Sequence, residues 1–485
     1  MADAHGPTKQ RLRAIDALIV AASAAVFVPF SLTRFIDGDE GVYAFVSKIV
    51  THGEIPYRDF AYPQMPLLPY VYGAWMRIAG ESWGSLRVFS ALLAVALGGL
   101  LYLHTFRRLG RIAAVIALFL YAASGLVFGW LTTVKSYSLS TVLLFGAYAL
   151  IDRAASGPRV FLGGIVLGLA IGTRLLIAGA APAFVVYLLA AQGARRTGSF
   201  VAGIVAGLVP TMVFLLLAPD AFIFDNIGWQ GVRSAGGLIG NLPQKLRIAA
   251  NLFGYGATDR EAGLQFALLF VAATATTLLV VRRERRVPLS ALIALAIGIT
   301  SLLPTPAYTQ YFCVAIPFLI VASLELVPSS NRGVLVAGAA LAIVIYGAAG
   351  AVDYGRYLGS GHYQDAEIGM VERVAAAINA NTRPGEKVMV SWPGYLLQTH
   401  ADAVPGFEEH FAPAVAGTLE PRRRARLHFL TPAAIETAIE SHQSRIAVFR
   451  TWVTVDPKPD WVNALARGHY RQIARIGGAG VYRAP

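Results

Sequence analysis

Hydrophobic residues gather in long runs along the chain, and each run ends at a polar or charged segment. Runs of about 17 to 22 residues have the length that an α-helix needs to cross a bilayer core. They predict about eleven spans, over residues 14–33, 83–105, 111–130, 136–151, 161–174, 176–191, 199–218, 263–281, 288–304, 309–325 and 333–352. The pattern therefore predicts an all-α polytopic membrane domain.

The apolar run from Phe161 to Ala190 is too long for a single span. As one helix it would extend about 45 Å at ~1.5 Å per residue, well beyond the thickness of a bilayer core. We therefore expect it to fold back as two short spans. Charge favours the same reading, because two spans leave more cations on the cytoplasmic side. Those cations are Arg195, Arg196, Arg282, Arg283, Arg285, Arg286 and Arg332, against Arg233, Lys245, Arg247 and Arg260 outside.

The same charge rule orients the chain in a cell inner (plasma) membrane. Lys9, Arg11 and Arg13 precede the first span, which reads as an uncleaved signal anchor with a cytoplasmic N-terminus. The loop at residues 34–82, the loop around 219–262 and the chain after Asp353 are then expected on the periplasmic or extracellular side.

Residues 353–485 have the composition of a soluble domain. Residues 367–380 show helical spacing, and a Pro-Gly-Glu-Lys turn at Pro384 leads into an apolar strand. Residues 445–450 and 472–482 also read as strands. We expect a small α/β domain here, after a membrane domain at residues 1–352.

Composition narrows the function class. The chain is 56% hydrophobic and 14% charged, which excludes a soluble core. Its net charge of +13 comes from Lys and Arg at the ends of apolar runs, so nucleic acid is not an expected partner. The single cysteine, Cys313, lies in an apolar run, which excludes an intrachain disulfide and a thiolate metal site.

The first exterior loop is rich in acids, bases and aromatic residues from Arg34 to Pro63. Apolar residues recur at helical spacing from Val42 to Val50, which predicts a helix lying flat at the interface and ending at Gly53. A second amphipathic stretch through Trp75 and Arg77 follows four prolines.

A capping box is the simplest explanation of the first acids. Asp37 would be the N-cap and Glu40 its partner three residues on, favourably placed at the helix dipole. This explanation leaves out Asp39 and the Tyr57 to Pro63 segment. A functional site is the alternative, and both stay open at this point.

The loop resembles the first periplasmic loop of GT-C superfamily glycosyltransferases, in the branch of protein O-mannosyltransferases and lipid A aminoarabinose transferases. The family's D-E-x-x-Y-A stands here at residues 39–44 and its F-x-K-P at residues 60–63. Gly168 to Arg174 is similar to the family's G-L-A-x-x-x-K, and the late span entered at Tyr308 to Pro317 and the C-terminal domain also match. The resemblance implies a polyprenyl-phosphate sugar donor.

Two residues depart from the family pattern. Tyr62 replaces the lysine of F-x-K-P, and Lys135 stands where family members often carry a second acid. The second departure weakens the case for a carboxylate pair bridging a metal. No cofactor is required by the sequence, and a divalent metal stays an option.

Sugar transfer from a polyprenyl phosphate needs a base for the acceptor and cations for the leaving phosphate. Asp39 is the candidate base, and Asp39 and Glu40 together are the candidate catalytic residues. Arg58, Lys135 and Arg174 are the candidate phosphate ligands. Snorkelling to the interface is the structural alternative for Arg174 and Lys135. The expected substrate pocket is made up of Asp37, Tyr43, Asp59, Tyr62, Tyr308 and Tyr311.

Weaker candidates have simpler explanations. Tyr308, Gln310 and Tyr311 fit an aromatic belt at the membrane interface. The residues His400, Asp402, Glu408, Glu409 and His410 fit a solvated loop better than a metal site. Arg422, Arg423 and Arg424 fit a solvated face, with anionic lipid headgroups as the alternative.

The sequence as a whole predicts an integral-membrane glycosyltransferase that acts on the exterior face with inversion at the anomeric carbon. The acceptor would be a lipid, a glycan or a protein. A secondary transporter, with Lys135 and Arg174 on a substrate path, is one alternative. A non-catalytic membrane scaffold of envelope assembly is the other.

Overall fold

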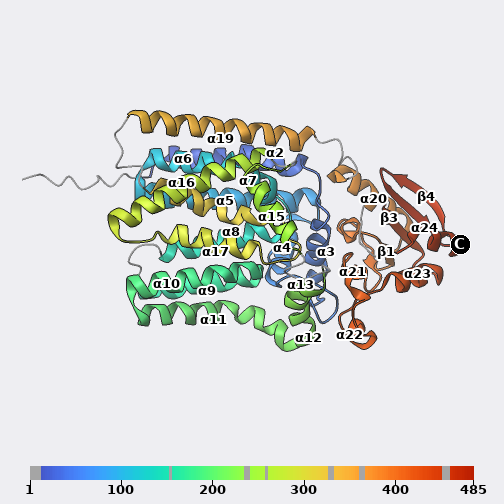
Figure 1. Ribbon diagram of the computed structural model, residues 1–485. Coiled ribbons are helices and arrows are strands. Elements are labelled where there is room, and N and C mark those ends of the chain that lie inside the picture. The colour runs from blue at the N-terminus through green and yellow to red at the C-terminus, as the bar shows by residue number, and fades with distance from the viewer. Residues whose placement is uncertain are drawn as a thin grey trace, which may run out of the picture.

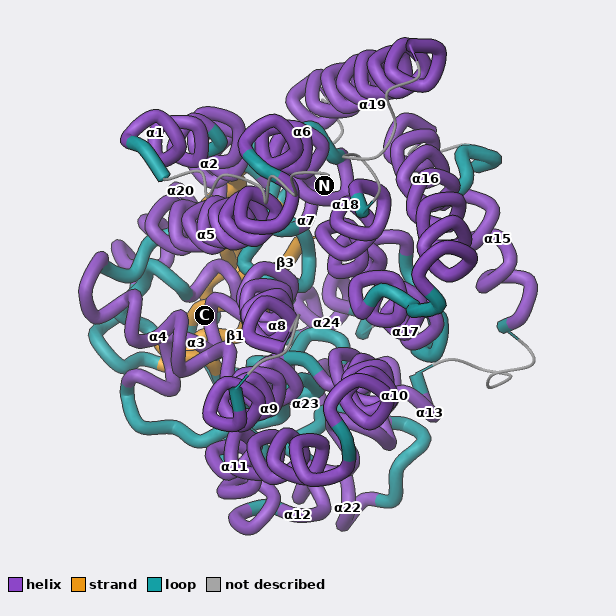
Figure 2. The backbone as a smooth tube through the Cα atoms, turned by 90° about the vertical axis from the view of Figure 1, so that its left-hand side faces the viewer, coloured by secondary structure: helices purple, strands orange, loops and turns teal. Residues whose placement is uncertain are grey.

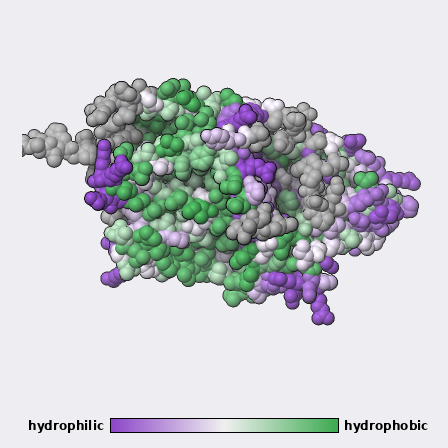
Figure 3. All heavy atoms as spheres, in the orientation of Figure 1, coloured by the Kyte–Doolittle hydropathy of each residue, from purple (hydrophilic) through white to green (hydrophobic). Residues whose placement is uncertain are grey.

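The computed structural model describes residues 12–151, 156–233, 241–256, 260–325, 333–359, 366–450 and 459–485. Lys9, Arg11 and Arg332, which contribute to the predicted topology, lie outside these ranges. Figure 1 shows a helical bundle at one end of the molecule and a smaller unit with a β-sheet at the other. In Figure 3, apolar residues cover much of the bundle, whereas hydrophilic residues gather towards the end formed by the smaller unit.

Each predicted span contains an apolar helix. Among the described residues, six helical segments are long and apolar enough to cross a membrane: α1–α2 (Ala14–Thr33), α5 (Trp83–Leu109), η1–α10 (Leu175–Gln192), α11 (Ala194–Leu217), α16 (Arg260–Glu284) and the part of α19 (Gly333–Gly359) from Gly338 to Gly359. Shorter apolar helices are α6 (Arg111–Ala122), α8 (Ser136–Ile151), α9 (Gly157–Thr173), α17 (Leu289–Ser301) and η3–α18 (Thr309–Leu324). The predicted span 111–130 divides at Ser124, where α7 (Gly125–Trp130) begins. Figure 2 looks along the bundle and places α8 near its middle.

The long apolar run reverses its direction at Arg174. Helix α9 ends at Thr173, Arg174 is extended, and a 3₁₀ turn leads into α10 (Ala181–Gln192). Helices α9 and α11 run parallel at close range, because Gly164 faces Gly203 and Gly168 faces Gly207. Since a sharp turn at Gly193 makes α10 antiparallel to α11, α10 must also run back along α9. Figure 2 shows α9 beside α11, with α10 to one side of them.

Short elements fill the junction between the bundle and the smaller unit. They are α3 (Glu40–Thr51), α4 (Leu67–Ala79), α12 (Pro219–Ile223), the π-helical turn η2 (Phe224–Gly228), α13 (Trp229–Val232) and α15 (Leu242–Leu252). The predicted helix after Asp39 is therefore present, but it is buried all round, whereas a helix lying flat at the interface would expose its polar side chains. Ser47 and Lys48 are buried, and the Lys48 ammonium donates to the carbonyl oxygens of Leu396 and Thr399. Helix α3 is buried on both faces because the C-terminal unit covers it.

The C-terminal unit is a mixed sheet with helices packed around it. Its strand order is β2-β1-β3-β5-β4, with β2, β1 and β3 parallel and β5 antiparallel to β3 and β4. The strands are β1 (Lys387–Val390), β2 (Asp402–Ala403), β3 (Ile446–Arg450), β4 (Arg471–Ile476) and β5 (Ala479–Arg483). The helices are α20 (Ile368–Asn381), η6 (Pro393–Leu396), α21 (Ala412–Ala416), α22 (Pro421–Arg426), α23 (Pro432–Glu440) and α24 (Trp461–Arg467). Residues 472–482, expected as one strand, form a hairpin instead.

Candidate functional site

The three acids Asp37, Asp39 and Glu40, which we call the acid motif, lie at the start of α3. The backbone N–H of Asp37 donates to Glu40 Oε1 at 2.8 Å, and Asp37 Oδ1 accepts from the N–H of Asp39 at 3.2 Å. One half of the expected capping box is therefore present. The helix itself begins at Glu40, and Asp39 stands in the N-cap position without a side-chain cap. Capping leaves the Asp39 carboxylate free for another role.

Glu40 is a buried connector between two loops. Its carboxylate pairs with Arg87 at 2.7 Å, and both side chains are fully buried. Glu40 Oε2 also accepts from the backbone N–H of Val134 at 2.8 Å, and Arg34 lies 4.0 Å away. Because Val134 precedes Lys135, Glu40 fixes the Lys135 turn against the acid loop. Its carboxylate is fully engaged and shielded from solvent.

Lys135 bridges the two remaining acids of the motif. Its ammonium lies 2.5 Å from Asp37 Oδ1 and 2.8 Å from Asp39 Oδ2. Burial raises the pKa of Asp37, but the Lys135 ammonium and the Arg34 guanidinium outweigh it and hold that pKa below its usual range. The Asp39 side chain is 46% exposed, against 2% for Lys135. Asp39 is therefore oriented by a buried cation and still open to a ligand.

Arg174 lies at the chain reversal after α9 and contacts Ser136, the residue that follows Lys135. Its guanidinium donates to Ser136 Oγ at 3.0 Å and lies over the rings of Tyr137 and Tyr311, 4.5 Å and 5.0 Å from their centroids. The residue is 7% exposed and interacts electrostatically with Tyr43, which in turn interacts with Asp39. Within the described part of the chain, no carboxylate pairs with this guanidinium. A buried, unpaired arginine is a strong site for an anion.

Arg233 is a third cation of the site, after Lys135 and Arg174, and the sequence reasoning assigned it to topology alone. Its guanidinium lies 5.7 Å from the ring centroid of Tyr308 and donates to the Tyr308 hydroxyl at 3.4 Å. Tyr308 and Tyr311 pack edge to face at 5.6 Å. The loop before Tyr308 is fixed by Gln244 of α15, which bonds the backbone of Ala307. A polar Arg-Tyr pair across two loops has no local sequence signal.

The C-terminal unit contacts the acid loop directly. Trp392 Nε1 donates to the carbonyl oxygen of Gly38 at 2.6 Å, and the Trp392 ring stacks on Trp83 with centroids 5.7 Å apart. A Cβ added to Gly41 would lie 2.3 Å from the same ring. The loop that carries Asp39 is therefore held between the bundle and this tryptophan.

Two titratable residues that the sequence reasoning did not assign to the site, Glu409 and His410, interact with the same region. Glu409 and His410 were expected in a solvated loop, but they are buried, with 3% and 8% exposure. Glu409 interacts electrostatically with Asp39, Asp225 and Arg233, and His410 with Asp37 and Asp39. Phe407 and Phe411, which flank them, were the available signal, since apolar neighbours favour burial.

Arg58 and Asp59 do not join this cluster. Their side chains pair with each other at 2.7 Å and are 48% and 30% exposed. The backbone carbonyl of Arg58 accepts from His428 Nε2 of the C-terminal unit. The Tyr62 ring lies closer to the motif, with its centroid 6.4 Å from that of Tyr43. The structure thus brings together Asp37, Asp39, Lys135, Arg174, Tyr43, Tyr308 and Tyr311 of the predicted residues.

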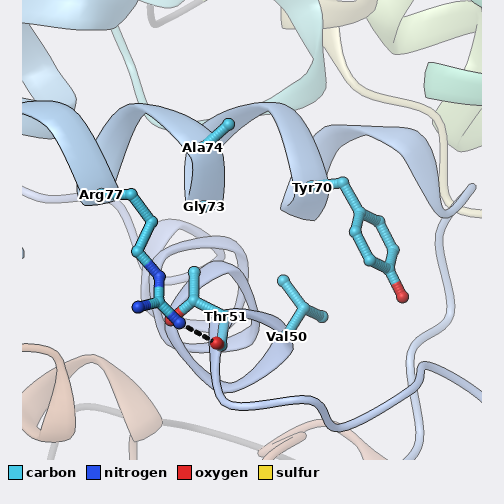
Figure 4. A pocket seen from close by; sticks show the side chains of 6 residues that line it. All are labelled: Val50, Thr51, Tyr70, Gly73, Ala74 and Arg77. Carbon is cyan, nitrogen blue, oxygen red and sulfur yellow. Dashed lines mark hydrogen bonds between the residues drawn. The ribbon is translucent and has the colours of Figure 1, made fainter.

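No metal arrangement is present in the described ranges, where no group of three or more His, Cys, Asp or Glu side chains could hold an ion. A cavity of about 190 Å³ lies between α3 and α4, lined by Val50, Thr51, Tyr70, Gly73, Ala74 and Arg77. Figure 4 shows Arg77 reaching across it to the carbonyl oxygen of Thr51. Its lining includes none of the acids of the motif.

Comparisons with known proteins give one family match and several structural matches. Residues 63–220 match the family described as dolichyl-phosphate-mannose-protein mannosyltransferase. The structure of ArnT from Cupriavidus metallidurans bound to undecaprenyl phosphate aligns with a TM-score of 0.68 and 17% identity, covering 97% of this chain and 98% of that one. The apo oligosaccharyltransferase of Archaeoglobus fulgidus aligns with a TM-score of 0.53 and 13% identity, covering 90% and 69%. No curated protein sequence matches the chain.

Proposed function

We propose that this chain, a multi-pass membrane glycosyltransferase of the GT-C fold, moves a sugar from a polyprenyl-phosphate donor to an acceptor hydroxyl, with Asp39 as the general base. The family match and the structural matches confirm the predicted resemblance, fold class and enzyme class. The observation that carries the proposal is the half-exposed Asp39 carboxylate, oriented by Lys135. The Arg174 and Arg233 guanidinium groups belong to the same electrostatic cluster.

The donor lipid is proposed from charge and from one relative. Arg174 and Arg233 both lie against tyrosine rings, and a phosphate would give the buried Arg174 guanidinium the anion that it lacks among the described residues. The ArnT structure holds undecaprenyl phosphate, which supports a lipid-linked donor here. Lys135 is already engaged by two carboxylates, so we assign it to orienting Asp39 and leave the phosphate to the arginines.

The reaction is a single displacement. Asp39 takes the proton of the acceptor hydroxyl, and the acceptor oxygen forms a bond to the anomeric carbon. The bond from that carbon to the phosphate oxygen breaks, and its electron pair leaves with the polyprenyl phosphate. Attack opposite the leaving group inverts the anomeric carbon. The phosphate leaves without needing a proton, so the guanidinium groups serve in place of a general acid.

Glu40 acts in this proposal as a positioning residue. Its carboxylate is buried and bonded to Arg87, Val134 and the Asp37 backbone, so it fixes the acid loop without touching substrate. Arg58 and Asp59 have no part in the proposed reaction. We place the site on the periplasmic or extracellular side of the inner membrane, with the N-terminus in the cytoplasm. The acceptor is a lipid, a glycan or a protein, and identification of the glycosylated product would tell these apart.

The test replaces Asp39 by asparagine in the purified full-length enzyme. We expect turnover with a polyprenyl-phosphate sugar to fall about 10² to 10⁴-fold, as for loss of a general base, while donor affinity is retained. Asp402→Asn is a matched control, because Asp402 pairs with Lys387 in the C-terminal unit. Near-normal turnover by Asp39→Asn would contradict the catalytic assignment. Absence of transfer by the wild-type enzyme with every such donor would favour a non-catalytic scaffold.

A further inference from the structure

Next to Asp39 lies a second polar cluster, which we define as Tyr62, Asp225, Glu409 and His410. Three of these side chains carry a buried polar atom that has no hydrogen-bond partner among the described residues: the Tyr62 hydroxyl, Asp225 Oδ1 and His410 Nδ1. The exposed fractions are 0%, 1% and 8%. An unmet polar atom costs free energy when it is buried, so several together indicate a binding site.

Three different segments build the second polar cluster. Tyr62 belongs to the first exterior loop, Asp225 to the π-helical turn η2, and Glu409 and His410 to the C-terminal unit. The Tyr62 N–H donates to Asp225 Oδ2 at 2.9 Å, and Glu409 Oε1 accepts from the N–H of Phe411 at 2.9 Å. One oxygen of Asp225 is thereby fixed to the backbone and the other is left without a partner. Single π-helical turns of this kind often occur at functional sites.

The second polar cluster adjoins both proposed reacting groups. Glu409 interacts electrostatically with Asp39, with Asp225 and with Arg233. His410 interacts with Asp37 and Asp39. Tyr62 interacts with Tyr43 and Glu409. Through Glu409 and His410 the cluster is therefore coupled to the proposed base Asp39 and, through Glu409, to Arg233.

The chemistry of these side chains is that of uncharged hydrogen-bonding groups. Burial raises the pKa of Asp225 and of Glu409 to about 8 and lowers the pKa of His410 to about 4. At neutral pH the two acids are then protonated and the imidazole is neutral. Hydroxyl and carbonyl groups of this kind complement the hydroxyl groups of a sugar, which both donate and accept hydrogen bonds.

We propose that the second polar cluster binds the sugar ring of the donor through its hydroxyl groups, and that this sugar is uncharged. The inference rests on the function proposed above. Asparagine and glutamine resemble the protonated acids in shape and in hydrogen bonding. They should therefore be tolerated at positions 225 and 409, whereas alanine should not.

The experiment uses the full-length enzyme with two probes, polyprenyl phosphate carrying a neutral hexose or pentose and bare polyprenyl phosphate as a competitive inhibitor. Asp225→Ala, Glu409→Ala and Tyr62→Phe should each raise the KM for the sugar donor about 10-fold to 100-fold. The Ki of bare polyprenyl phosphate should not change. Asp225→Asn and Glu409→Gln should keep most of the donor affinity. Tyr62→Phe removes a hydroxyl without a described protein partner, so loss of folding cannot explain its effect.

Glu408→Ala is the matched control. Glu408 is a buried neighbour of Glu409, but it accepts from the Gly406 N–H and interacts with Glu54 and Lys387 instead. It should leave the KM for the donor unchanged.

Three results would overturn the inference. The first is that the variants weaken binding of bare polyprenyl phosphate as much as binding of the sugar donor. The second is that Asp225→Asn or Glu409→Gln loses as much donor affinity as the alanine variant, and the third is that the wild-type enzyme prefers a donor with a charged sugar. Failure of the proposed function would look different, because the wild-type enzyme itself would then transfer no sugar from these donors.

Discussion

At the scale of the residue, the adjacent acids Asp39 and Glu40 differ in every physical respect. Asp39 is 46% exposed and has Lys135 as its ionic partner. Glu40 is fully buried and bonded to Arg87 and Val134. The sequence could indicate both as candidates because they share one motif. It could not divide their roles, since Arg87 belongs to α5 and Lys135 to the turn before α8, far from the motif in the sequence.

Glu40→Gln should therefore act on stability first. It leaves the buried Arg87 guanidinium without its carboxylate, and breaking a buried ion pair from one side costs about 3–5 kcal/mol. Thermal unfolding of the purified protein measures the loss. Glu386→Gln is the control, because its pair with Arg445 is solvent-exposed and worth about 0–1 kcal/mol. Equal unfolding temperatures for Glu40→Gln and the wild type would show that Glu40 does not anchor the loop.

Asp225 should make stability depend on pH. Its pKa in the folded protein is about 8, against 3.8 for the ordinary side chain, so the folded state keeps a proton that the unfolded state loses. The contribution of the protonated Asp225 side chain to the free energy of unfolding is fully present below about pH 4 and is lost as the pH rises towards about 8. Asp225→Asn keeps an acceptor for the Tyr62 N–H and cannot ionise. Its unfolding temperature, relative to wild type, should increase from about pH 5 to about pH 8. A difference that is constant with pH would mean that Asp225 is already ionised in the folded protein.

At the scale of the element, α3 shows where sequence periodicity stops being informative. The apolar stripe from Val42 to Val50 correctly predicts a helix with a stop at Gly53, whose φ of 99° suits glycine. The same pattern predicts a solvated polar face, yet Ser47 and Lys48 are buried. The Lys48 ammonium donates hydrogen bonds to carbonyl oxygens about 350 residues further along the chain. No local pattern can encode such a partner.

Gly41→Ala tests whether docking of the C-terminal unit on α3 supports activity. Alanine favours a helix over glycine by roughly 1 kcal/mol, but its Cβ would lie 2.3 Å from the Trp392 ring. The ring would have to move, and its hydrogen bond to Gly38 beside Asp39 would be disturbed. We expect lower turnover with the donor KM nearly unchanged. Gly84→Ala is the control, because the nearest atom to its Cβ is a Leu32 methyl at 3.9 Å. Equal turnover of the two variants would show that this contact does not position the acid loop.

At the scale of the whole molecule, hydropathy predicts the spans well because bilayer thickness sets their length. The junction is less predictable, since η2, Arg233 and the Glu409 loop come from segments that are far apart in the sequence. Loops from three parts of the sequence converge on Asp39, and each of them is short or polar. The sequence pattern of each loop fits an aromatic belt at the membrane interface, a helix cap or a solvated turn equally well.

The orientation of the molecule in the membrane can be tested with single cysteines. Helix α5 begins at Trp83, which stacks on Trp392 of the C-terminal unit, and ends beside Arg108, which pairs with Glu325. Glu325 also pairs with Arg286, next to the end of α16 at Glu284. Glu284 therefore lies at the opposite end of the bundle from Trp392. Cysteines at Asp59 and Glu436 should then share one side of the membrane, and a cysteine at Glu284 should occupy the other.

An impermeant thiol reagent applied to intact cells from the periplasmic side should label Asp59→Cys and Glu436→Cys and spare Glu284→Cys. The native background is low, because Cys313, the single cysteine of the sequence, is buried. The replaced side chains are 30%, 27% and 45% exposed, so protection at Glu284 would reflect the membrane and not burial. Labelling at 284 together with protection at 59 and 436 would invert the proposed orientation. It would also place Asp39 on the cytoplasmic side, where the acceptor would have to be a cytoplasmic or inner-leaflet molecule.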